Sequence, residues 1–254
     1  MGMSEAAPMP VIIRGRRVMF LPSRPGDGPQ PLKRPPCSYC GKPGHAFAPT
    51  WGSHLGSSGV LRDNILGKRE ADAHRWYTGR WSISAHHLIC SEAMADDDDW
   101  ATYCHEFGYD INRRENGVIL PSRMGVACEL HVPVHRGNHV EGWAYDVQLA
   151  YPKAVMAELR RIRAQVAHGA YCSNPAALIQ RLDELSARIL VKVARFRWTL
   201  SSDGLDYQDD GVGCAGVTSI TDKPRRPCPH ARKHGSKHGV TGEALTRHPL
   251  SVGG

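Results

Sequence analysis

Two closely spaced pairs of histidines constrain this chain more than any other feature of its sequence. His86 and His87 are adjacent at the end of a short apolar run, and His135 and His139 are four residues apart. Residues four apart at the start of a helix lie on one face and can hold one metal ion. Adjacent residues of a strand point to opposite sides, so one of the first pair can bind the metal while the other faces a substrate water. Three ligands, one base and an open metal position make up the arrangement that a hydrolytic site needs.

The order of three motifs is more specific than either histidine pair, since each pair alone is more often an ordinary polar feature of a core or surface. Residues 84–89 read SAHHLI, residues 109–121 read YDINRRENGVILP, and residues 134–139 read VHRGNH. In this order they resemble the AHH family of the HNH/endonuclease VII superfamily, nucleases with a ββα-metal core. The resemblance covers roughly residues 81–165. It implies an α+β fold with an HNH-like nuclease core and a mainly helical C-terminal elaboration, after a loop-rich N-terminal part that zinc could stabilise.

The resemblance also implies a role for each motif residue. His86 matches the metal ligand at the end of the first strand, and His87 matches the general base. Asn116 matches the central asparagine of HNH motifs, which orients the loop that holds the base through backbone hydrogen bonds. His135 and His139 match the remaining metal ligands, before and on the following helix.

The implied chemistry is hydrolysis of a phosphodiester bond. A neutral imidazole with a pKa near ~6.5 can take a proton from water at neutral pH. The attack would leave 5′-phosphate and 3′-hydroxyl ends, while a metal ion neutralises the developing charge. Three imidazoles prefer Zn²⁺ or Ni²⁺, but Mg²⁺ or Mn²⁺ could serve with phosphate and water oxygens, and the sequence does not choose. Arg136 lies between the last two ligands and is a candidate phosphate contact.

Composition along the chain predicts five parts. They are an N-terminal tail with a small hairpin and linker (1–36), a Cys/Gly-rich loop region (37–80), the nuclease core (81–168), a C-terminal helix (169–200) and a basic, turn-rich tail (201–254). Patterns of apolar residues predict the regular elements within these parts. They indicate a hairpin in 11–21, strands in 81–90 and 117–121, and helices over 96–107, 153–167 and 175–198.

The cysteines suggest a second metal site. Cys37-x2-Cys40-x4-His45 has the opening of a zinc knuckle, but Thr50 stands where a fourth ligand would be. Cys37 and Cys40 are therefore a half-site for structural zinc, and the alternative is a pair of ordinary thiols. The other half would come from elsewhere in the chain, with the candidates Cys90, Cys104, Cys128, Cys172, Cys214, Cys228 and His230. A further candidate set is Cys228, His230, His234 and His238, although a basic tail is more often solvated chain that touches phosphates.

Charge and hydropathy exclude some classes of protein. Lys and Arg outnumber Asp and Glu by 32 to 25, a net charge of +7 that favours a polyanionic partner. No segment approaches the ~20 apolar residues of a membrane span. The first residues, MGMSEAAPMPVIIRGRR, place their positive charges after the apolar run, the reverse of a secretory signal. An integral membrane protein and a Sec-secreted protein are therefore not expected.

Three functions remain open. The first is a DNA-cleaving antibacterial toxin, because the resembling domains are frequent at the toxic tips of polymorphic toxins and secretion-system effectors. That implies a secretion-apparatus or chaperone partner, a cognate immunity protein, and delivery from the producer's cytoplasm into a target cell's cytoplasm, by type VI secretion or a similar route. The second is an HNH-type nuclease of restriction, phage or mobile-element processing. The third is a non-enzymatic, zinc-stabilised nucleic-acid-binding module. DNA is a likelier substrate than RNA on the resemblance.

Overall fold

The computed structural model describes residues 10–13, 16–19, 36–43, 50–67, 71–79, 82–95, 97–136, 139, 141–201 and 249–254. The chain divides into two compact units, Met1–Pro35 and Pro36–Gly254. In the first unit, β1 (Pro10–Ile13) pairs antiparallel with β2 (Arg16–Met19), which confirms the predicted hairpin. The five-part division expected from composition stays a prediction.

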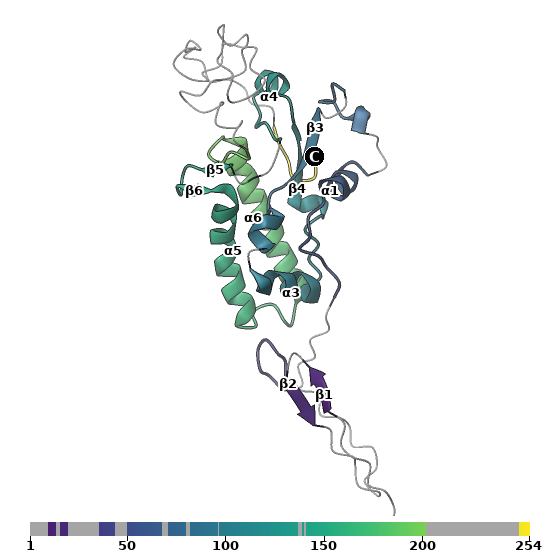
Figure 1. Ribbon diagram of the computed structural model, residues 1–254, viewed down its shortest axis with the longest axis vertical. Coiled ribbons are helices and arrows are strands. Elements are labelled where there is room, and N and C mark those ends of the chain that lie inside the picture. The colour runs from purple at the N-terminus through teal and green to yellow at the C-terminus, as the bar shows by residue number, and fades with distance from the viewer. Residues whose placement is uncertain are drawn as a thin grey trace, which may run out of the picture. The chain divides into compact units, whose positions relative to one another are not determined.

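The second unit is built on a two-stranded antiparallel hairpin that carries the first histidine pair. Strand β3 (Ile83–His87) pairs with β4 (Gly117–Pro121), with His86 opposite Val118 and His87 opposite Gly117. Both strands were predicted. The C-terminal residues run beside β4, where Gly253 donates to the Gly117 carbonyl at 2.7 Å (Figure 1).

One face of this hairpin is covered by a helix that no sequence pattern predicted, α1 (Ser58–Leu66). Its Leu61 and Ile65 pack against Ala85 of β3 and Ile119 of β4. Gly117 permits the contact, because a Cβ there would lie 2.6 Å from a methyl carbon of Leu61. A helix that buries only two side chains has too weak an apolar period to stand out in the sequence.

Helices form the main core on the other side of the sheet. They are α2 (Ser91–Ala95), α3 (Asp98–Phe107), α5 (Tyr151–Ala167) and α6 (Pro175–Ala194), with α4 (Met124–Leu130) after β4. In Figure 1, α5 and α6 run side by side with α3 across them. The buried residues of α5 and α6, including Leu159, Ile162, Leu182 and Leu185, recur at the helical spacing that predicted both helices. Mixed helices and small antiparallel sheets confirm the α+β class.

Three predicted helix boundaries need correction, and the first is that the helix expected over 153–167 begins two residues earlier, at Tyr151. The helix expected over 96–107 starts at Asp98, because the Asp97 side chain accepts from the Asp99 N–H and caps it. The helix expected to reach residue 198 ends at Ala194. Phe196 has a φ of 55°, which is outside the right-handed helical region and ends the helix. Trp198 instead forms a β-bridge with Ala144, in the hairpin of β5 (Trp143–Ala144) and β6 (Leu149–Ala150).

Short 3₁₀ turns complete the unit: η1 (Ala71–Ala73) and η2 (Arg114–Asn116). Of the helices described, none is both long and apolar enough to span a bilayer.

Candidate active site

Three of the predicted metal ligands converge. The Nε2 atom of His139 lies 2.9 Å from Nδ1 of His86 and 3.0 Å from Nε2 of His135. One ligand atom from each residue lies within 4.8 Å of the other two. His86 comes from β3, whereas His135 follows α4 in an irregular segment. The structure therefore brings together the three imidazoles that the sequence singled out.

The helical placement of the second pair was wrong. His135 and His139 both precede the next helix, α5, which begins only at Tyr151. His135 lies in non-helical chain directly after Pro133 and Val134, and its N–H donates to the Pro121 carbonyl at 3.0 Å. The two residues therefore converge outside any helix that the structure describes.

The chemistry of this cluster fits a divalent metal ion. Burial, followed by the neighbouring histidines, holds the pKa of His86 well below its ordinary value and lowers the pKa of His135 to about 3. These rings therefore stay neutral, and each presents a nitrogen lone pair to the cluster. Nε2 of His139 faces one nitrogen of His86 and one of His135, and a single proton on it could form a hydrogen bond to only one of them. Beside them, Oε2 of Glu92 is buried with no hydrogen-bond partner among the described residues. A cation would balance that carboxylate and engage all three nitrogens.

A second layer of side chains orients each ligand. The Tyr151 hydroxyl donates to the Leu88 carbonyl at 2.7 Å and lies 3.0 Å from His86 Nε2. Because its proton is already used, it accepts from His86 Nε2–H, which leaves the lone pair of Nδ1 facing the cluster. Ser84 Oγ lies 3.2 Å from Nδ1 of His135.

Glu92 performs the same task for His139. Its Oε1 lies 3.3 Å from His139 Nδ1, and this interaction is the main cause that lowers the Glu92 pKa to about 2. A carboxylate that accepts from Nδ1–H leaves Nε2 free to bind metal. Sequence reasoning missed Ser84, Glu92 and Tyr151. The first two stand close to His86 in the sequence, but only the fold shows what they contact.

His87 is held separately from the metal cluster. It is buried, and its Nε2 lies 3.0 Å from Oδ1 of Asn112. The Asn112 amide nitrogen donates to the Leu55 carbonyl at 2.9 Å and to Asp110, so the oxygen is the end that faces His87. An amide oxygen only accepts, which puts the proton on Nε2 and the lone pair on Nδ1. Burial lowers the His87 pKa although the Asn112 hydrogen bond raises it, so the ring is neutral at pH 7.

Asn116 is fully buried behind the strand that carries the histidines. Its amide nitrogen donates to the carbonyls of Ile89 (3.0 Å) and Ile111 (2.9 Å). Its oxygen accepts from Ile89 N–H and from the Ser186 hydroxyl, both at 2.8 Å. These bonds tie the end of β3 to the turn before β4 and to α6, so Asn116 acts on His87 through the backbone.

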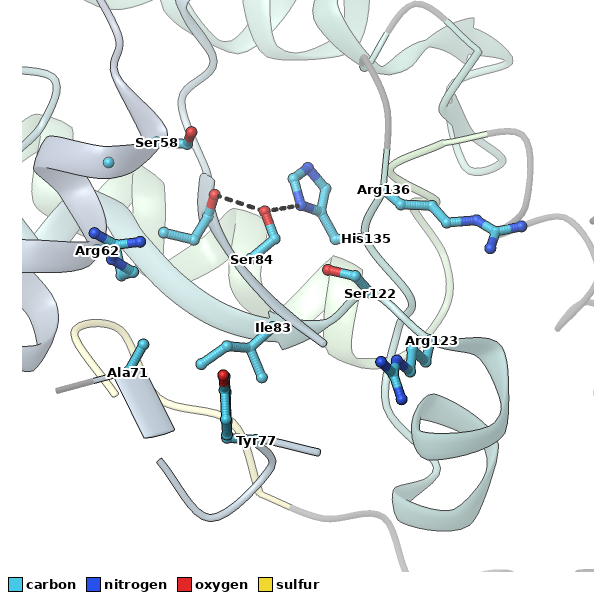
Figure 2. Close-up of a pocket in the computed structure, with 12 residues that line it drawn as sticks. Ser58, Arg62, Ala71, Tyr77, Ile83, Ser84, Ser122, Arg123, His135 and Arg136 are labelled. Atoms are coloured by element: carbon cyan, nitrogen blue, oxygen red, sulfur yellow. Dashed lines mark hydrogen bonds between the residues drawn. The ribbon is translucent and has the colours of Figure 1, made fainter. Parts of the chain in front are cut away.

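An open cavity of about 820 Å³ is lined by one histidine of the cluster, His135 (Figure 2). Its floor includes Ser84 and His135, Arg62 of α1 lies on one side, and Arg123 lies at the start of α4 on the other. Arg136, the predicted phosphate contact, also lines it, and its side chain extends away from the His135 ring. A hollow bordered by guanidinium groups suits a phosphate backbone.

The structure also places a third cysteine, Cys172, beside the two of the predicted zinc half-site. One sulfur from each of Cys37, Cys40 and Cys172 lies within 4.8 Å of the other two. Cys90 and Cys104 are instead buried in the helical core as free thiols, and Cys128 is disulfide-bonded. The other candidates fall outside the described residues: His45, Cys214, Cys228, His230, His234 and His238.

Comparison with known proteins agrees with this site. No curated protein and no solved structure gives a significant match to the chain. Residues 67–189 match the model of AHH, described as a nuclease family of the HNH/ENDO VII superfamily with conserved AHH. The matched segment includes the β3–β4 hairpin, the histidine cluster, His87 and Tyr151. Residues 67–189 of this chain therefore match the AHH nuclease family of the HNH/ENDO VII superfamily.

Proposed function

We propose that this chain is a metal-dependent endonuclease that hydrolyses phosphodiester bonds of DNA. The observation that carries the proposal is that two adjacent histidines have different surroundings. His86 joins a cluster of three imidazoles, and His87 is a neutral ring whose Nε2 is held by Asn112. The metal-dependent hydrolysis proposed here needs both a cation site and a base, and adjacent residues of one strand, His86 and His87, would supply a ligand and the base.

In the proposed reaction His87 is the general base. Its Nδ1 takes a proton from a water molecule as that water attacks the phosphorus, and the ring becomes an imidazolium. The Asn112 oxygen accepts from Nε2–H throughout, so it keeps the ring oriented and stabilises the positive charge that forms. Asn116 keeps the strand end in place during this step.

His86, His135 and His139 would hold one divalent ion, Mg²⁺, Mn²⁺, Zn²⁺ or Ni²⁺. Such an ion supplies positive charge that neutralises the charge developing on the phosphate and the leaving oxygen. Tyr151, Ser84 and Glu92 hold the rings in the tautomers that binding requires.

The arginine-bordered cavity supports a nucleic-acid substrate, and the net charge of +7 agrees with it. Arg62, Arg123 and Arg136 would contact phosphates on either side of the scissile bond and carry no base specificity. Replacing Arg123 with Ala should weaken binding about equally for all sequences and lower the salt dependence by about one phosphate contact.

The test of substrate is cleavage of supercoiled plasmid and of RNA by the purified chain with each metal and with EDTA. We expect nicking of plasmid, loss of nicking in EDTA, and 5′-phosphate product ends. The active-site variants His86→Ala and His87→Ala should lose nicking. Their matched control is His105→Ala, which changes an exposed histidine of α3 away from the cluster. Cleavage of RNA alone would overturn the DNA assignment, and cleavage of neither would favour a non-enzymatic nucleic-acid-binding module.

We further propose that the nuclease serves as an antibacterial effector, made in the producer's cytoplasm and delivered into a target cell by type VI secretion or a similar apparatus. The support is the resemblance to domains of polymorphic toxins. A cognate immunity protein with an acidic surface would complement the arginines of the cavity. We expect expression in a bacterial cytoplasm to arrest growth, and a small acidic protein encoded next to it to restore growth. A neighbouring methyltransferase or terminase gene, without such rescue, would favour a restriction or phage nuclease.

A further inference from the structure

A second group of metal-binding side chains lies outside the active site. Cys37 and Cys40 belong to the turn of residues 36–43, and Cys172 belongs to the connection between α5 and α6. Their sulfurs lie within 4.8 Å of one another, and none of the three belongs to a disulfide. Cys37 and Cys172 are buried and Cys40 is half-buried, so the cluster is largely shielded from solvent. None of the steps proposed for the nuclease uses it.

The turn around Cys37 and Cys40 is shaped to present two sulfurs to one side. The Gly41 N–H donates to the Cys37 carbonyl at 2.8 Å, and the Cys37 N–H donates to the Lys42 carbonyl at 3.2 Å. Gly41 has a φ of +68°, a conformation that a side chain would strain, and it reverses the chain directly after the second cysteine.

The backbone of the α5–α6 connection contacts this turn at Gly169. Gly169, with a φ of +75°, leaves no room for a side chain, since a Cβ there would lie 2.6 Å from Cys40 Cβ. Cys172 follows three residues later, and its thiol donates to the Gly169 carbonyl at 3.1 Å. The close approach brings the third sulfur to the first two.

Aromatic packing holds the turn from a second direction. The Tyr39 ring meets Phe107 of α3 edge to face with centroids 5.0 Å apart, and its hydroxyl donates to the Glu106 carboxylate. The turn is therefore seated on α3 and on the α5–α6 connection at once, which places the thiols between segments that are far apart in sequence.

We propose that Cys37, Cys40 and Cys172 bind a structural zinc ion that joins the turn of residues 36–43 to the α5–α6 connection. Thiolate is the soft ligand that Zn²⁺ selects, and two cysteines separated by two residues are the usual half of a structural site. A disulfide would use only two of the three sulfurs, whereas a tetrahedral ion takes all three and one more ligand. Binding releases the three thiol protons to solvent, so the affinity rises with pH.

The proposed ion would support the nuclease without touching its chemistry. Helix α5 carries Tyr151, which orients His86, and α6 carries Ser186, which contacts Asn116. The connection between these helices is the part that the ion would hold. Its loss should loosen both helices while leaving every active-site residue present.

Cobalt substitution tests the site independently of nuclease activity. Co²⁺ bound by thiolates gives a near-ultraviolet sulfur-to-metal charge-transfer band, which an all-imidazole site lacks. We expect this band in the full chain and in His139→Ala, and its loss in Cys172→Ser. Cys172→His should keep a weaker thiolate band, because imidazole can replace one thiolate ligand while Cys37 and Cys40 remain. Cys104→Ala, which removes a buried thiol outside the cluster, should keep the band unchanged.

Three results would overturn the proposal. They are no thiolate band in the reduced, correctly folded wild type, a band of unchanged intensity in Cys172→Ser, and mass-spectrometric detection of a disulfide between two of these cysteines in protein purified without oxidant. If Cys172→Ser does not fold, zinc content and the cobalt spectrum of Cys172→His decide the question. A failure of the nuclease proposal would leave all these measurements unaffected.

Discussion

Asn116→Ala is the substitution that most sharply tests how the catalytic strand is held. The Asn116 amide makes four hydrogen bonds, to Ile89 N–H, to the carbonyls of Ile89 and Ile111, and to the Ser186 hydroxyl. The residue is fully buried, so water cannot replace the amide without opening the core. Alanine would leave three backbone groups without this partner, while the hydroxyl can rotate to another.

The size of the effect follows from that count. An unsatisfied buried backbone group costs about 1–3 kcal/mol, and neighbouring losses relax together, so we expect Asn116→Ala to lower the free energy of unfolding by about 3–5 kcal/mol. That is a large share of the about 5–15 kcal/mol typical of a domain. Ser186→Ala removes only one of the four bonds and should cost about 0.5–1.5 kcal/mol.

Urea unfolding followed by circular dichroism and tryptophan fluorescence measures both variants. At temperatures where Asn116→Ala is still folded, its nicking rate should fall because the strand end that carries His87 is no longer pinned. If the free energy of unfolding of Asn116→Ala lay within about 1 kcal/mol of the wild-type value, the account of Asn116 would be refuted. A Ser186→Ala variant that is destabilised as much as Asn116→Ala would refute it too.

Three further outcomes follow from the geometry. Glu92→Gln should weaken metal binding about 10–100-fold, measured by titration calorimetry, because the charged acceptor behind His139 is lost; unchanged affinity would remove Glu92 from that role. Gly52→Ala should lower the free energy of unfolding by about 1–3 kcal/mol in a urea titration, because the new Cβ would lie 2.3 Å from a backbone carbonyl oxygen of α3; a neutral effect would mean that this contact is not rigid. Because burial holds the His87 pKa below its ordinary value, the base stays neutral on moderate acidification, so nicking should begin to fall only below pH ~6.5; a fall that begins above that pH would contradict the assignment.

The sequence was informative where short-range pattern decides the structure. The apolar residues of α5 and α6 recur with a helical period, β4 is a dense apolar run, and the segment around β3 has strand character up to its two histidines, so all four elements were predictable. The histidines were predictable because their chemistry is distinctive in that order. Local patterns of this kind can be recognised without knowing which distant segments pack against them.

The remaining features depend on contacts between distant segments. Helix α1 is specified by its packing on the sheet rather than by its own period. The four-residue spacing of His135 and His139 suggested a helix, whereas the next helix that the structure describes begins only at Tyr151. Asn112, whose oxygen holds His87, belonged to a recognised motif, but its contact depends on how the loop folds back. Cys172 could be chosen among the cysteines only once the α5–α6 connection was seen beside Cys40.

The central claim is that adjacent histidines of one strand do different work, His86 binding the metal and His87 acting as the base. The direct measurement pairs metal titration with plasmid nicking for His86→Ala and His87→Ala, with folding checked by circular dichroism. We expect His87→Ala to bind metal nearly as wild type does and to lose nicking, and His86→Ala to lose both. A His87→Ala variant that nicks plasmid at the wild-type rate, or loses metal as His86→Ala does, would contradict the account.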